Sequence, residues 1–193
     1  MKSFLSLAQS RRSTRKFKPD AIPHEMVMQL QQVILLSPAS KRSNPWEFIF
    51  VDDTVLLQKL AIAKPHGGAF LKECPLAVVV LADPQKSDVW VEDTSIASIY
   101  IQLAAEDLGL GSCWVQIHQR QHESGEMASE YIKKLLNIPQ NYEVESIIAL
   151  GYKAEERKPA DLEKLLYNRI HTNTFTNPYG STGSPTSHKP LNP

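Results

Sequence analysis

The sequence RRSTRKF, residues 11–17, places four cations and two hydroxyl side chains within seven positions. Arginine presents a planar fork of N–H donors that matches phosphate oxygens, and Ser and Thr add short donors. The segment follows a short apolar helix predicted over Ser3–Gln9 and precedes a loop opened by Pro19. Taken alone, the pattern fits either a solvated basic linker or a site for an anion such as a phosphate.

The charge distribution favours one local anionic ligand over a nucleic acid. The whole chain of 193 residues is neutral, with 21 Lys+Arg and 21 Asp+Glu, whereas nucleic-acid binders usually carry a basic excess. Residues 1–46 nevertheless hold eight Lys+Arg against two Asp+Glu. The basic character is therefore concentrated around residues 11–17, and we expect no nucleic-acid partner.

The cysteine content and the hydropathy pattern predict a cytoplasmic protein. Cys74 and Cys113 form no disulfide framework, which fits a reducing compartment. The first ten residues lack the apolar core of a signal peptide, and the longest apolar run, Leu76–Ala82, is too short to cross a bilayer. We expect no membrane association.

Helical and strand periodicities alternate along the chain, which predicts a mixed α/β or α+β layer structure. Strands are predicted where β-branched and aromatic residues cluster, and Pro75–Ala82 reads as a strand covered on both faces. The segment Glu92–Leu108 is so apolar that we expect it at the centre of the domain or in a subunit interface. The predicted helices are Ser3–Gln9, His24–Ser37, Val55–Ala63, Glu92–Leu108, Ser124–Leu136 and Asp161–Asn168, with a short helical piece at Ala69–Glu73; the strands are Trp46–Val51, Pro75–Ala82, Ser112–His118 and Tyr142–Tyr152, and His171–Phe175 is predicted to be extended.

Four landmarks in order resemble the FMN-dependent nitroreductase family, over roughly Ser3–His171. They are residues 11–17 after a short helix, the loop SPAS at residues 37–40 followed by NPWEF at 44–48, the helix closing in LGLGSCW at 108–114, and LGY at 150–152 before a basic loop. The resemblance implies an α+β fold, with a mixed central sheet flanked by helices. It also implies an intertwined homodimer whose C-terminal arm lies on the partner subunit. The predicted domain covers residues 1–175, with a flexible tail at 176–193.

The same resemblance implies which residues hold the cofactor FMN, and that the flavin itself carries the chemistry, so that no catalytic side chain is required. The flavin phosphate, ribityl chain and pyrimidine edge would be contacted by Arg11, Arg12, Ser13 and Arg15. The other subunit would contribute Pro38, Ala39, Ser40 and Arg42. The phosphate would also be contacted by Arg157 and Lys158, and the core neighbours beside the flavin would be Cys113 and Trp114.

The chain departs from the family pattern at two places. Arg42 stands where many members have Asn, and Gln116–Gln121 (QIHQRQ) does not match the loop that meets the flavin N5 atom in many relatives. His118 and His122 are spaced i, i+4, but no further ligand cluster supports them, so we expect no metal.

Three functional hypotheses remain open at this stage. The first is an enzyme that passes electrons from NADH or NADPH through FMN to nitroaromatics, quinones or similar small acceptors in ping-pong fashion. The second is a flavin-binding protein of the same fold with little nicotinamide turnover, which stores or senses flavin or belongs to a specialised reductive branch. The third is a phosphate-ester-binding module without redox chemistry.

Overall fold

The computed structural model describes residues 3–177, and the chain divides into two compact units, Met1–Pro159 and Ala160–Pro193. This division comes before the predicted domain boundary at residue 175. Of the predicted tail, only Thr176 and Asn177 lie within the described residues.

The first unit is built on one sheet with the strand order β1-β2-β4-β3, in which all three strand pairs are antiparallel. The strands are β1 (Trp46–Val51), β2 (Leu76–Ala82), β3 (Gly111–Gln116) and β4 (Glu143–Gly151). The predicted α+β class is confirmed. Within residues 3–177, the parallel component expected of a mixed sheet is confined to one isolated bridge, between Ser13 and Ser112.

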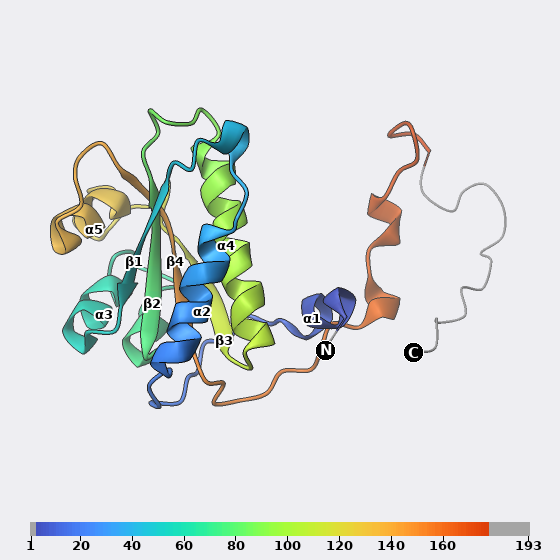
Figure 1. Cartoon of the computed structure of the whole chain (residues 1–193), viewed down its shortest axis with the longest axis horizontal. Coiled ribbons are helices and arrows are strands. Elements are labelled where there is room, and N and C mark those ends of the chain that lie inside the picture. Colours follow the sequence, from blue (N-terminus) through green and yellow to red (C-terminus); the bar gives the residue numbers. More distant parts are fainter. Residues whose placement is uncertain (1–2, 178–193) are drawn as a thin grey trace. The chain divides into compact units, whose positions relative to one another are not determined.

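Helices cover both faces of this sheet, and Figure 1 shows α2 and α4 on one face and α3 and α5 on the other. Two apolar cores result, one on each face. Strand β2 is buried at every position, because a central strand between two helical layers has no solvent side. The helices are α1 (Phe4–Ser10), α2 (His24–Leu35), α3 (Thr54–Ala61), α4 (Trp90–Asp107) and α5 (Ala128–Leu136).

A glycine turn ends α4 and leads the chain into β3. Gly109 has φ +77°, and the Leu110 N–H donates to the Ala105 carbonyl at 2.7 Å. This is the Schellman closure that a glycine permits, because only glycine adopts a left-handed backbone without a Cβ penalty. The predicted helix-ending role of the Gly109–Gly111 segment is confirmed.

Three predicted segments differ from the structure. The helix predicted from Ser124 begins only at Ala128, because residues 121–127 form a tight hairpin with Gly125 at φ +88°. The C-terminal segment forms two short 3-10 turns, Leu162–Lys164 and Tyr167–Arg169, in place of one helix. The segment predicted to be extended at 171–175 is bent, with Asn173 at φ +63°.

Both cysteines are buried, and the first tryptophan packs on a neighbouring aromatic ring. Cys74 is buried, and its thiol donates to the Leu71 carbonyl at 3.2 Å. Burial raises the pKa of the Cys74 thiol to about 11, so the reactive thiolate is disfavoured. The Trp46 ring packs on Phe48 with a centroid distance of 5.2 Å.

A β-bulge buries one acid in the sheet. Val80 pairs with Ser146 and Leu81 with Val144, which leaves Glu145 without a partner residue on β2. Glu145 is 2% exposed, the Gln116 side-chain amide donates to its Oε1 at 3.5 Å, and its Oε2 has no partner among the described residues. Burial raises the pKa of this carboxyl group to about 6.

Replacing Glu145 with glutamine is therefore expected to stabilise the protein at pH 8. The folded-state pKa lies above the unfolded value of 4.5, so the native state binds the extra proton. The stability that this proton contributes is present below pH 4.5 and is lost as the pH rises through 6. Glu145→Gln should raise the free energy of unfolding by about 1–2 kcal/mol at pH 8 and by almost nothing at pH 4.5. Urea denaturation at the two pH values measures this, and a gain that does not depend on pH would contradict it.

Candidate functional site

Residues 11–17 run beside the ends of two strands and are clamped by backbone hydrogen bonds. The Thr14 N–H donates to the Ser112 carbonyl at 2.9 Å, and the Lys18 N–H donates to the Tyr152 carbonyl at 2.9 Å. Phe17 forms an antiparallel bridge with Lys153. The segment is therefore an ordered part of the domain, which contradicts the alternative of a solvated linker.

A glycine makes this clamp possible at its tightest point. A Cβ atom at Gly111 would lie 2.5 Å from Oγ1 of Thr14 and 2.7 Å from its Cβ, which no side chain tolerates. Thr14 is itself buried, whereas its neighbours Ser13 and Arg15 are not. Alternation along an extended segment then turns Arg11, Ser13 and Arg15 to the side opposite Thr14.

Several of the predicted cofactor residues meet around the buried thiol of Cys113. Burial raises the pKa of this thiol, while the charge of Arg15, a hydrogen bond with Ser13, and the charges of Arg11 and Arg157 lower it. These four side chains come from two segments more than 140 residues apart in sequence. The structure thus places Arg11, Ser13, Arg15 and Arg157 close enough to the Cys113 thiol to lower its pKa.

Two further cations belong to the same group, and the sequence analysis missed them. Burial and the charge of Arg120 lower the pKa of Lys64, while Cys113 raises it. Lys64 follows α3 and Arg120 follows β3, so neither is near residues 11–17 in sequence. We call Arg11, Arg15, Lys64, Arg120 and Arg157 the basic cluster. The only sequence feature that could have pointed to either residue is the position of Lys64 in a loop that contains Gly67 and Gly68.

The acidic neighbour of this cluster is already engaged elsewhere. Glu155 pairs with Lys16 at 2.9 Å and reaches Arg157 only at 3.8 Å. Its hydrogen bond to Lys16 lowers the pKa of the Glu155 carboxyl group. The ion pairs among residues 3–177 give no carboxylate to the other four members of the cluster. The cluster is therefore an excess of positive charge suited to an anion.

Other predicted residues lie outside this cluster. Arg12 and Lys158 are exposed, and the contacts of the described residues do not join them to it. Trp114 neighbours Cys113 on β3, so its side chain points to the opposite face, where it packs with the α2 and α4 core. The Trp114 Nε1–H donates to Gln116 Oε1 at 2.9 Å.

The Pro38–Asn44 loop, which carries the predicted residues Pro38, Ala39, Ser40 and Arg42, lies at the far end of α4. The Ser40 N–H donates to Oδ1 of Asp93, in the first turn of α4, at 2.8 Å. Residues 11–17 lie near the other end, where the chain leaves α4 at Asp107 and Ser13 bridges Ser112 at the start of β3. Fourteen residues at 1.5 Å each separate Asp93 from Asp107 by about 21 Å. One chain therefore does not bring the loop and residues 11–17 together.

The two histidines considered for a metal face different partners. His118 packs against Trp90 with a ring-centroid distance of 4.9 Å, and His122 stacks on Tyr131 at 4.3 Å. Within residues 3–177, no three His, Cys, Asp or Glu side chains are grouped so that they could hold a metal ion.

Comparison with known proteins decides the family. A family model described as the nitroreductase family matches residues 8–64 and 55–152. The chain belongs to the nitroreductase family. Its fold is closely similar to a solved FMN-dependent nitroreductase from Clostridium difficile R20291. The two share 43% identity and a TM-score of 0.88, over 89% of this chain and 100% of that one.

Other relatives of this nitroreductase-family chain agree. A protein of Methanothermobacter thermautotrophicus named "Putative NADH dehydrogenase/NAD(P)H nitroreductase" is 34% identical over 161 residues, which cover 82% of this chain and 81% of the relative. A solved structure with the same name from Parabacteroides distasonis is 31% identical with a TM-score of 0.79, over 89% and 98% of the two chains. In the part of the chain that the structure describes, no helix is both long and apolar enough to cross a membrane.

Proposed function

We propose that this protein is an FMN-dependent oxidoreductase that passes electrons from NADH or NADPH to small acceptors such as nitroaromatics and quinones. The basic cluster carries this proposal, because several cations without paired carboxylates meet where the family resemblance puts the flavin phosphate. Membership of the nitroreductase family supports the redox activity. Two buried cysteines without a disulfide are compatible with a reducing cytoplasm.

The residues present fit the shape and charge of FMN. A phosphate dianion needs several charge-assisted donors, and Arg11, Arg15 and Arg157 supply them on the side of Cys113 where Ser13 adds a hydroxyl. Lys64, whose ammonium form burial disfavours, would gain from an anionic group beside it. The fixed backbone of residues 11–17 keeps these donors in place before the ligand arrives, which lowers the entropic cost of binding.

Bound FMN would supply hydride acceptance and electron donation, and the protein would supply binding, orientation and a shaped space over the ring. We propose that nicotinamide and acceptor would use this same space in turn. This supports a ping-pong order, in which the oxidised nicotinamide leaves before the acceptor enters.

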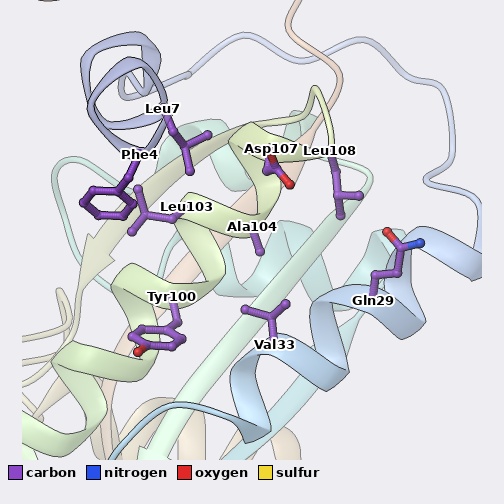
Figure 2. A pocket seen from close by; sticks show the side chains of 9 residues that line it. All are labelled: Phe4, Leu7, Gln29, Val33, Tyr100, Leu103, Ala104, Asp107 and Leu108. Atoms are coloured by element: carbon purple, nitrogen blue, oxygen red, sulfur yellow. The ribbon is translucent and has the colours of Figure 1, made fainter. Parts of the chain in front are cut away.

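The site would be completed by a second copy of the chain. The Pro38–Asn44 loop and residues 11–17 lie near opposite ends of α4, so we infer that a loop that contacts the flavin comes from a partner. An apolar groove of about 590 Å³ also lies between α1, α2 and α4. Figure 2 shows Phe4 and Leu7 of α1 facing Tyr100 and Leu103 of α4 across it. Such a groove on an isolated chain is typical of an interface.

Two further features support the homodimer. Ile96, Ile99, Tyr100 and Leu103 form an i, i+3, i+4, i+7 stripe, and the two isoleucines are 37% and 38% exposed. The described part of the second unit, residues 160–177, exposes six large apolar side chains as well, which suits an arm that lies on a partner subunit. They are Leu162, Leu165, Leu166, Tyr167, Ile170 and Phe175.

The purified full-length protein should be yellow, and stopped-flow mixing should show its flavin absorbance bleached by NADH or NADPH. Adding a nitroaromatic or a quinone should then restore the absorbance, and the two reduction rates would give the nicotinamide preference. A colourless protein that also fails to take up added FMN would contradict the proposal.

The loop after β3 favours one second candidate, a flavin-binding protein with little nicotinamide turnover. Both the Ile117 and the His118 N–H donate to the Glu145 carbonyl, at 3.0 and 2.9 Å, so neither is available to a flavin ring nitrogen. Gln119 beyond them is left-handed, with φ +56°. Full FMN occupancy with negligible reduction by either nicotinamide would establish this candidate.

A further inference from the structure

The Pro38–Asn44 loop has a backbone that its own sequence does not favour. Lys41, Arg42 and Asn44 have φ values of +52°, +56° and +41°. Side chains with a Cβ atom rarely adopt this left-handed region, and a Lys–Arg pair is less suited to it than Asn. Two backbone hydrogen bonds inside the loop close this turn, from the Arg42 N–H to the Ala39 carbonyl at 3.2 Å and from the Ser43 N–H to the Ser40 carbonyl at 2.9 Å. Contacts from outside the loop add to them.

Burial does not hold the loop. Pro38, Lys41, Arg42 and Asn44 are all exposed. A polar cavity of about 220 Å³ lies between the loop and residues 85–88, and polar side chains line it. The loop therefore lacks the apolar packing that usually secures a strained backbone.

Two aspartates form hydrogen bonds with the loop or with the residue that follows it. The Asp83 N–H donates to the Pro45 carbonyl at 3.0 Å, at the loop's exit. At its centre, the Ser40 N–H donates to Oδ1 of Asp93 at 2.8 Å. Asp93 is only 2% exposed, although it is a carboxylate.

The surroundings of Asp93 explain how this carboxylate is accommodated. Its Oδ2 accepts a hydrogen bond from the Ser87 hydroxyl at 2.8 Å, and the Val89 N–H donates to the same hydroxyl oxygen at 3.3 Å. Asp93 also lies in the first turn of α4, where the helix dipole favours a negative charge. The ion pairs of residues 3–177 include none with Asp93, so its charge is balanced by the helix end and by two hydrogen bonds.

We propose that Asp93 is a positioning residue that fixes the Pro38–Asn44 loop in the conformation with which it contacts the flavin of the partner subunit. The role in flavin binding rests on the proposed function, whereas the tether itself does not. Without the carboxylate, the Ser40 N–H loses its acceptor and the left-handed residues relax. The loop then has to be ordered again each time a ligand binds, which weakens binding.

The exposed bonds after Lys41 and Arg42 make the tether measurable without flavin, because trypsin cleaves after these residues. In full-length protein freed of flavin, Asp93→Ala should raise the rate of cleavage at Lys41 and Arg42 about tenfold or more. Asp93→Asn should behave like the wild type, because its amide oxygen still accepts from Ser40 and its NH₂ group can donate to Ser87. Ser87→Ala keeps the bond between Ser40 and Asp93 and removes the Ser87 hydroxyl, which donates to Asp93 and accepts from the Val89 N–H. It should have a smaller effect than Asp93→Ala.

A titration with FMN, followed by quenching of flavin fluorescence, tests the role in binding. Asp93→Ala should raise the dissociation constant about tenfold, and Asp93→Asn should restore it. Unchanged tryptic cleavage would overturn the tether, whatever happens to FMN. Faster cleavage with unchanged FMN affinity would overturn the positioning role, and a wild type that binds no FMN would overturn the proposed function and this role with it. If Asp93→Ala does not fold, fast hydrogen exchange of the Ser40 amide in the wild type would overturn the proposal.

Discussion

Replacing Arg11 and Arg15 together with alanine is expected to abolish the retention of FMN during purification. The charges of these two guanidinium groups lower the pKa of the Cys113 thiol, and no carboxylate of residues 3–177 pairs with them. A hydrogen bond to a charged group contributes about 1.5–3 kcal/mol. Each replacement should therefore raise the dissociation constant of FMN at least about tenfold, and the double variant about 100-fold or more.

Lys18→Ala is the matched control for this experiment. Lys18 is an exposed cation that directly follows residues 11–17. Its backbone N–H donates to the Tyr152 carbonyl, and the substitution keeps this hydrogen bond. The flavin affinity of Lys18→Ala should equal that of the wild type. Thermal unfolding without flavin should show that the wild type, the double variant and Lys18→Ala are all folded. If the double variant still carried a full complement of flavin, the assignment of the basic cluster to the phosphate would be wrong.

Replacing Leu103 with aspartate is expected to convert the protein into a monomer that no longer holds FMN. Leu103 lines the apolar groove beside Phe4 and Leu7, and burying an unpaired carboxylate in an interface costs several kcal/mol. Light scattering should then give a mass near 21.7 kDa in place of twice that value. Flavin should be lost at the same time, because the partner's loop is lost.

Gln32→Asp serves as the control, since Gln32 is an exposed polar residue of α2 that does not line the groove. It introduces the same charge on a helix surface and should leave both the mass and the flavin content unchanged. A Leu103→Asp variant that stays dimeric would show that this groove is not the interface. A monomer that still binds FMN tightly would show that one chain suffices for the site.

The sequence predicted the sheet well because its strands have strong and local signals. The β1 strand at Trp46–Val51 and the 3-10 turn at Ala69–Glu73 have the predicted bounds, because β-branched runs and breakers such as Gly68 and Pro75 mark their ends. The start of α5 was missed because Ser124, an apparent cap, bonds to His122 and Glu126 inside a hairpin. The Ser124 side chain therefore bonds within a local turn and does not cap a helix.

The candidate site was predictable only where its residues form a motif. Arg11, Ser13 and Arg15 lie in one segment whose alternation already places them on one side. Lys64 and Arg120 come near them only through the packing of α3 on the sheet and the pairing of β3 with β4, which no local pattern encodes. The dependence of the Pro38–Asn44 loop on Asp93, 53 residues away from Ser40, likewise requires the fold.

A complementation experiment between subunits tests most directly whether one FMN is held by the basic cluster of one chain and the loop of another. The Arg11→Ala/Arg15→Ala variant lacks the cluster, and a Ser40→Phe variant blocks the loop with a bulky side chain. Homodimers of either variant should bind no FMN. In a purified heterodimer both defects fall on one site, which leaves the other site intact, because the two sites of a twofold dimer are equivalent. The heterodimer should therefore bind one FMN per dimer. A heterodimer that binds none would show that the cluster and the loop act within the same chain.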